Sequence, residues 1–145
     1  MDDEVLYTFA VPLFVMLPRK TKPAKKVILN FNQYHIWSTF KRNEIKSVFT
    51  KQLERTLIDS GLVPLRFIRK IRYELYLGRG GRHDTRNVTN LIDKYVCDAL
   101  VTYGYLEDDT WQYIGKTEDT CIGIDRNNPR VEVTIYGYPR NQSED

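Results

Sequence analysis

The sequence predicts one α/β domain in which a mixed β-sheet packs against two main helices. Its 145 residues suit a single domain with a proper core. Hydrophobic residues make up 41% of the chain and charged residues 28%, which is typical of a globular protein and excludes a disordered one. The periodicity of the apolar residues changes along the chain in the order strand, helix, strand, helix and then two strands.

The first expected strand covers residues 5–17, VLYTFAVPLFVML, which are apolar almost throughout. Pro12 cannot donate a backbone hydrogen bond, so it indicates an edge strand or a bulge. The stretch from Arg19 to Lys26 carries five basic residues and Pro23, and we expect a loop there. A polar turn is expected at residues 30–34.

The first long helix is expected from His35 or Ile36 to Asp59, ending at Gly61. An apolar stripe at helical spacing supports it. The stripe consists of Ile36, Phe40, Ile45, Val48, Phe49, Leu53 and Leu57.

A half-buried strand is expected from Phe67 to Leu77, because apolar and polar residues alternate at its end. Ile71, Tyr73, Leu75 and Leu77 would share the buried face. A turn rich in glycine and arginine follows, Gly78 to Arg82. Its backbone could approach a phosphate closely and its arginines could hold the charge, although a flexible connection explains the same composition.

The second main helix is expected from about Val88 to Tyr103, with Gly104 ending it. Apolar residues at steps of three and four form its buried face: Val88, Leu91, Ile92, Tyr95, Val96, Ala99 and Tyr103. Asp84, Thr85 and Asn87 are all candidates for its N-terminal cap. Asp93 points away from this face, and we expect it to be solvated.

Two further strands are expected, Thr110 to Ile124 and Arg130 to Tyr138, joined by a turn at Asp125 to Pro129. Residues 1–4 and 140–145 are expected to be loose termini.

The formal net charge of +3 understates how basic the body of the chain is. Five acidic residues belong to the termini, and without them 22 basic residues stand against 14 acidic ones. Such a balance suits a polyanion partner, although a basic protein without one remains an alternative. Cys97 and Cys121 lack metal-ligand spacing, and no apolar run approaches the ~20 residues that span a bilayer. We therefore expect reduced thiols, a cytoplasmic location and no membrane association.

Several polar and charged side chains lie on the second helix and next to its two ends. At about 100° per residue, Asn87, Lys94 and Asp98 fall near one line along that helix. Asp84 precedes it, and Asp108 and Asp109 follow the turn after it. Carboxylates and amides suit a hard cation such as Mg²⁺, and a lysine beside them can neutralise a phosphate oxygen. The alternative is a solvated acidic turn with an exposed lysine.

These residues resemble the core of the RusA-type Holliday junction resolvases, small endonucleases common in phages. The family pattern has an Asp, an Asp-Asn pair two residues on, a Lys in the helix, Asp-Ala-Leu, a glycine turn and Asp-Asp. The matching residues here are Asp84, Asn87, Lys94, Asp98-Ala99-Leu100, Gly104, Leu106, Asp108 and Asp109. The segments VPLFVMLPRKT and LNFNQY near the N-terminus also resemble a phage branch of the family.

The resemblance implies a RusA-like homodimer that resolves four-way DNA junctions by Mg²⁺-dependent phosphodiester hydrolysis, with Mn²⁺ as a possible substitute. Asp84 and Asp109 would be the main metal ligands, followed by Asp108 and Asp98. Lys94 would steady the phosphate, and Asn87 would orient a ligand or water. The DNA backbone would be held by Arg79, Arg82 and Arg86.

The chain departs from the family pattern in two places. Arg86 stands where the family has its second acid, and three extra residues separate Asn87 from Lys94. Either Asp98 or Asp108 takes over the role of the missing acid, or a second hypothesis applies, a RusA-like protein that binds branched DNA without cutting it. A third is a phage structural protein that never meets DNA.

Overall fold

The computed structural model describes residues 3–80 and 84–140 of the chain. A four-stranded sheet with the strand order β1-β6-β4-β5 forms its centre. The strands are β1 (Val5–Pro12), β4 (Leu65–Leu77), β5 (Ile114–Ile124) and β6 (Arg130–Pro139). Strands β4 and β5 run parallel, whereas β6 pairs antiparallel with both β1 and β4. The sheet is therefore mixed, as expected, and β1, which ends at Pro12, is an edge strand.

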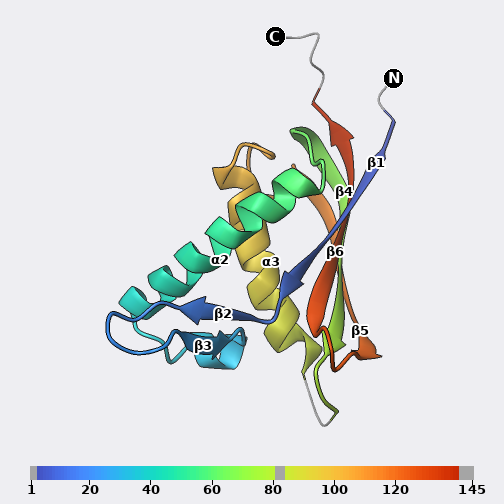
Figure 1. The fold of residues 1–145 in the computed structure, drawn as a ribbon. Coiled ribbons are helices and arrows are strands. Elements are labelled where there is room, and N and C mark those ends of the chain that lie inside the picture. Colours follow the sequence, from blue (N-terminus) through green and yellow to red (C-terminus); the bar gives the residue numbers. More distant parts are fainter. Residues whose placement is uncertain (1–2, 81–83, 141–145) are drawn as a thin grey trace.

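Two long helices, α2 (Thr39–Asp59) and α3 (Thr85–Thr102), cover one face of this sheet (Figure 1). A single core lies between them and the strands. Helix α2 contributes Ile45, Phe49, Leu53 and Leu57, and α3 contributes Leu91, Ile92, Tyr95, Val96, Ala99 and Leu100. The sheet contributes Ile71, Tyr73 and Leu75 from β4 and Val131, Val133 and Ile135 from β6, which confirms the alternation predicted for β4.

The apolar run of residues 5–17 forms two strands rather than one. Strand β2 (Phe14–Leu17) leaves the sheet after β1 and pairs antiparallel with β3 (Lys25–Ile28) in a separate hairpin. The backbone carbonyl of Leu13, at the break, accepts a hydrogen bond of 2.9 Å from the Leu29 amide. The hairpin packs on the rest of the domain, because its buried residues Val15, Leu17, Val27 and Leu29 belong to the same hydrophobic core. The expected loop at residues 19–26 is therefore wrong at its end, where β3 begins.

The region expected to be a polar turn contains a short helix, α1 (Phe31–Tyr34), capped by the side chain of Asn30. Helix α2 starts later than expected, at Thr39, where the Ser38 hydroxyl accepts a hydrogen bond from the Lys41 amide. The apolar stripe is wrong at its start, since Ile36 and Phe40 are 74% and 78% exposed. Ile36 precedes the helix. Phe40 lies about 140° around the helix from Ile45, so it faces solvent.

Strand β5 also starts later than expected, because residues 110–113 form a turn in which the Tyr113 amide donates to the Thr110 carbonyl. Glycine 115 suits the close pairing with β4: a Cβ there would lie 2.8 Å from the Arg69 carbonyl oxygen. The β5 strand thus reaches β4 directly after this turn, which fixes the position of the acidic residues just before it.

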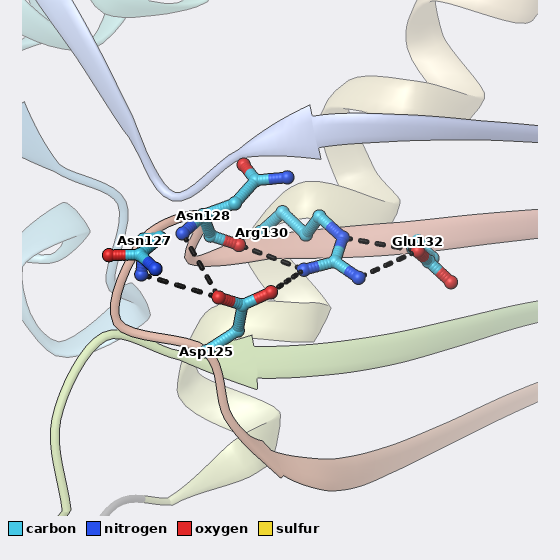
Figure 2. Close-up of polar contacts among 5 residues, drawn as sticks. All are labelled: Asp125, Asn127, Asn128, Arg130 and Glu132. Carbon is cyan, nitrogen blue, oxygen red and sulfur yellow. Dashed lines mark hydrogen bonds and ion pairs between the residues drawn. The ribbon is translucent and has the colours of Figure 1, made fainter.

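The expected turn between β5 and β6 is present and is held by ion pairs (Figure 2). Asp125 accepts hydrogen bonds from the amides of Asn127 and Asn128. Arg130 donates to Asp125 at 2.9 Å and to Glu132 at 3.0 and 3.1 Å. A cavity of about 430 Å³ beside this turn has Arg130 as its charged lining residue. Because two carboxylates already engage Arg130, we assign no ligand to that cavity.

Both ends of the described chain contact the sheet. Glu4 forms a bidentate ion pair with Arg69, and the Arg140 amide donates to the Pro64 carbonyl at 2.9 Å. The remainder of the termini expected to be loose lies largely outside the described residues. None of the described helices is long and apolar enough to cross a membrane.

Candidate functional site

Helix α3 carries most of the predicted site residues, and its two ends are built as the sequence suggested. Among the three candidate caps, Asp84 serves: its side chain accepts a hydrogen bond of 3.0 Å from the Arg86 amide. Gly104 follows the helix with φ +80°, a conformation that residues with a side chain rarely adopt. Leu106 is buried just beyond it, so the chain turns back toward the sheet before the acidic residues.

The N-terminal end of α3 faces α1 across a cavity of about 380 Å³, the capping cavity. Its lining residues are Asp84, Arg86, Asn87 and Asn90 from α3 and Phe31, Asn32 and His35 from α1 and its end. Asp84 and Arg86 are exposed, and Asn87 is half-buried. The cavity thus presents one carboxylate, one guanidinium and several amides.

The middle of α3 faces the start of β5 across a second cavity of about 400 Å³, the acidic cavity. Its lining residues are Asp93, Lys94, Cys97, Asp98, Asp109, Trp111, Ile114 and Thr117. Lys94 and Asp98 are one helical turn apart and lie on the same edge of α3, as predicted. The turn after α3 adds Asp109, and Trp111 at the rim is 81% exposed.

Asp93 is half-buried and hydrogen-bonded to the sheet, so the expectation of a solvated side chain is wrong. Its carboxylate accepts hydrogen bonds from the hydroxyl of Tyr73 on β4 and from the thiol of Cys97. Tyr73 is fully buried, and burial followed by the neighbouring thiol and carboxylate raises its pKa well above 10.0. Burial, reinforced by Asp93 and Asp109, likewise raises the pKa of the Cys97 thiol. Asp93, which lines the acidic cavity, is therefore held in place by two hydrogen bonds.

Asp98 forms an ion pair with Lys46 of α2, with 2.8 Å between the Lys46 ammonium nitrogen and a carboxylate oxygen. Both side chains are partly exposed, so the pair contributes little to stability. Its consequence is local, because Lys46 balances one of the three carboxylates of the acidic cavity.

The structure does not bring Asp84 and Asp109 together in one chain. Asp109 lies in the acidic cavity, whose first lining residue on α3 is Asp93. Asp93 lies nine positions after Asp84, or about 14 Å further along a helix. Ligands of one Mg²⁺ lie within about 2.1 Å of the ion, so Asp84 and Asp93 cannot share one, and Asp109 lines the cavity of Asp93 rather than that of Asp84. Within the described residues, no three carboxylate, histidine or cysteine side chains come close enough to hold a metal ion.

The other predicted residues are spread around this helix. Asp108 is exposed and accepts a hydrogen bond of 2.8 Å from the Asp109 amide, which stabilises the turn, and it is not among the lining residues of the acidic cavity. Arg79 is exposed just beyond β4. Arg82 and the neighbouring His83 lie outside the described residues.

Three residues of this region escaped the sequence reasoning, namely Asp93, Trp111 and Lys46. A signal existed for Asp93, because the alternation of β4 buries Tyr73 and a buried tyrosine hydroxyl requires a partner. No local pattern identifies Lys46, since its contact with Asp98 joins two helices.

No model of a known protein family matches the chain, and no curated protein matches it either.

Proposed function

We propose that the protein is a Mg²⁺-dependent, structure-selective endodeoxyribonuclease that resolves four-way DNA junctions. The observation that carries this proposal is the acidic cavity. It gathers Lys94, Asp98 and Asp109, all chosen from the sequence for phosphodiester chemistry, from two segments separated by a turn. The resemblance of residues 84–109 to the RusA-type resolvases supports the same function.

Within a single chain the two expected ligands line different cavities, Asp84 the capping cavity and Asp109 the acidic cavity. A two-fold axis crossing α3 would place the N-terminal end of one copy beside the middle of α3 in the other. The capping cavity of one subunit would then meet the acidic cavity of its partner. We therefore propose a homodimer in which each metal site takes Asp84 from one subunit and Asp109 from the other.

The remaining side chains have roles that follow from their positions. Lys94 is exposed at the acidic cavity, where its ammonium group would neutralise a phosphate oxygen. Arg86 and Asn87 line the capping cavity, where a guanidinium can hold a phosphate through two hydrogen bonds and an amide can orient a ligand. When bound, Mg²⁺ would lower the pKa of the attacking water and orient the scissile phosphate.

A labelled four-way junction with Mg²⁺ tests the proposal, comparing the wild type with Asp109→Asn. We expect paired symmetric nicks from the wild type and a loss of cleavage with largely retained DNA binding in the variant. Asp59→Asn, which changes an exposed carboxylate at the end of α2, is the matched control and should cleave normally. Cleavage by the Asp109→Asn variant would contradict the assignment of Asp109 to the active site.

The second candidate is a RusA-like protein that binds branched DNA without cutting it. It is favoured by Arg86, which replaces an acid of the family pattern. Calorimetric titration with Mg²⁺ separates the two functions, because only the nuclease should show a Mg²⁺ site that Asp84→Asn or Asp109→Asn removes. Tight junction binding without cleavage in either Mg²⁺ or Mn²⁺ would establish this second function.

A further inference from the structure

The charge of this chain is distributed unevenly along its sequence. Residues 5–43 contain seven basic residues and no aspartate or glutamate. The rest of the chain carries 15 basic against 19 acidic residues. The N-terminal segment is therefore at +7 and the remainder at −4, so a modest net charge hides a strongly basic region.

The fold concentrates part of this charge on one surface. Lys25 and Lys26 of β3 and Lys41 in the first turn of α2 line a cavity of about 450 Å³. Asn30, Gln33 and Trp37 line it as well, and Lys25 and Lys26 are exposed. Arg19, Lys20 and Lys22 are exposed on the loop between β2 and β3, the long blue loop of Figure 1. We call the surface formed by the three cavity lysines the basic hairpin surface.

The cavity lysines are not neutralised by carboxylates. None of the three forms an ion pair with a residue that the structure describes, whereas Lys70 and Lys116 both pair with Glu118. Their contacts are with aromatic rings: the Lys26 ammonium lies 4.4 Å from the Phe14 ring centre and that of Lys41 lies 5.9 Å from the Trp37 ring centre. Such contacts position an ammonium group and leave N–H donors for an anion.

Two further features, one of the backbone and one of side chains, favour an anion at the same place. The cavity lies at the N-terminal end of α2, a 21-residue helix, where the helix dipole is positive. Asn30 and Gln33 add amide donors from the cap and body of α1. Side-chain and helix charges therefore act in the same direction.

We propose that the basic hairpin surface binds the phosphate backbone of a DNA arm. Helix α1 connects it to the candidate site, because Asn30 and Gln33 line the lysine cavity while Phe31 and Asn32 line the capping cavity. A duplex held by the hairpin would lead past α1 toward Asp84 and Arg86. Lysine ammonium groups contact phosphates as point charges, so this binding is independent of base sequence. The assignment of DNA as the ligand rests on the proposed function.

The test measures affinity for a four-way DNA junction without divalent metal, as a function of salt concentration. The variant is Lys25→Ala/Lys26→Ala/Lys41→Ala. Its control is Lys51→Ala/Arg55→Ala/Arg126→Ala, which removes the same charge at exposed positions elsewhere. Each phosphate contact contributes about 0.9 to the slope of log affinity against log salt, so we expect the slope per subunit to fall by about 2.7 in the first variant. The control should retain the wild-type slope, and thermal unfolding should show that both variants fold.

Equal decreases of the salt slope in both triple variants would contradict a role for the basic hairpin surface, because the effect would then come from net charge alone. An unchanged slope in the first variant would overturn it as well. Binding of the wild type to vesicles of phosphatidylglycerol but not to the junction would replace DNA by a membrane as the ligand. Cleavage with Mg²⁺ is scored separately. The salt slope could fall only in the first variant while the wild type shows no cleavage. That result would support the basic hairpin surface and contradict the proposed nuclease activity.

Discussion

The Tyr73 hydroxyl on β4 donates a hydrogen bond to the carboxylate of Asp93 on α3, a lining residue of the acidic cavity. This bond ties the central sheet to the helix that carries the candidate site. Cys97, one turn further along α3, donates to the same carboxylate oxygen at 3.3 Å. The position of Asp93 is thus set by two donors, one of them from a fully buried side chain.

Replacing Tyr73 by phenylalanine should destabilise the protein by about 1.5–3 kcal/mol, because a hydrogen bond to a charged acceptor is lost. The control is Tyr103→Phe, which removes a hydrogen bond of 3.0 Å to the neutral Thr50 carbonyl and should cost about 0.5–1.5 kcal/mol. Urea unfolding of the three proteins gives both values. Equal losses in free energy of unfolding would show that the hydrogen bond to the Asp93 carboxylate is no stronger than one to a neutral carbonyl.

Alkaline pH should destabilise the fold through the same tyrosine. The pKa of Tyr73 is raised well above 10.0 in the folded protein, whereas an unfolded tyrosine titrates near 10. Above about pH 10 the unfolded chain loses this proton first, so the free energy of unfolding falls by up to about 1.4 kcal/mol per pH unit. Burial raises the pKa of Tyr95 to about 12, which acts in the same direction. Between pH 8 and 11, the free energy of unfolding should therefore fall less steeply with pH for Tyr73→Phe than for the wild type. The same pH dependence in both proteins would contradict this.

The two cysteines should differ in reactivity. Cys121 on β5 is exposed, while Cys97 is buried and its raised pKa keeps the thiol protonated. Because the thiolate is the nucleophile, a thiol reagent at neutral pH should modify one cysteine in the native protein and both after unfolding. Cys121→Ala should abolish the native reaction. Two rapid modifications of the native protein would contradict the packing described for Cys97.

The helices were more predictable than the contacts between elements. Helix α3 follows from its apolar period, and its caps at Asp84 and Gly104 follow from residue type. The break at Leu13 could not be predicted, because both β1 and β2 are apolar and only their separate partners distinguish them.

In the candidate site, too, positions within one helix were predictable and contacts between elements were not. Lys94 and Asp98 lie one helical turn apart, so their shared edge could be read from spacing. Whether Asp84 meets Asp109 depends on the length of α3 and on the path of the turn after it, and spacing along a sequence does not give that distance.

Trp111 should contribute to junction binding, since a large aromatic side chain that is 81% exposed stands at the rim of the acidic cavity. Stacking of a base on an aromatic ring is worth about 1–3 kcal/mol, so Trp111→Ala should weaken junction binding about 5- to 150-fold. Trp111→Phe keeps a stacking surface and should lose less. Unaltered affinity in the alanine variant would exclude this role.

The proposed two-subunit metal site makes a prediction that a metal site within one chain does not. Asp84→Asn and Asp109→Asn proteins should each be inactive, yet a mixture unfolded and refolded together should nick junctions. Random pairing makes half of the dimers mixed, and each mixed dimer holds one complete site, so about a quarter of the wild-type sites return.

Because a mixed dimer has only one such site, its products should be nicked junctions rather than resolved duplexes. The control mixes Asp84→Asn with the double variant Asp84→Asn/Asp109→Asn, a pairing in which no complete site can form and no cleavage should return. If the first mixture also stays inactive although its subunits are shown to exchange, Asp84 and Asp109 do not serve one metal ion across the dimer. In that case the acidic cavity, with Asp93 as its anchored carboxylate, is where the ligands must be sought.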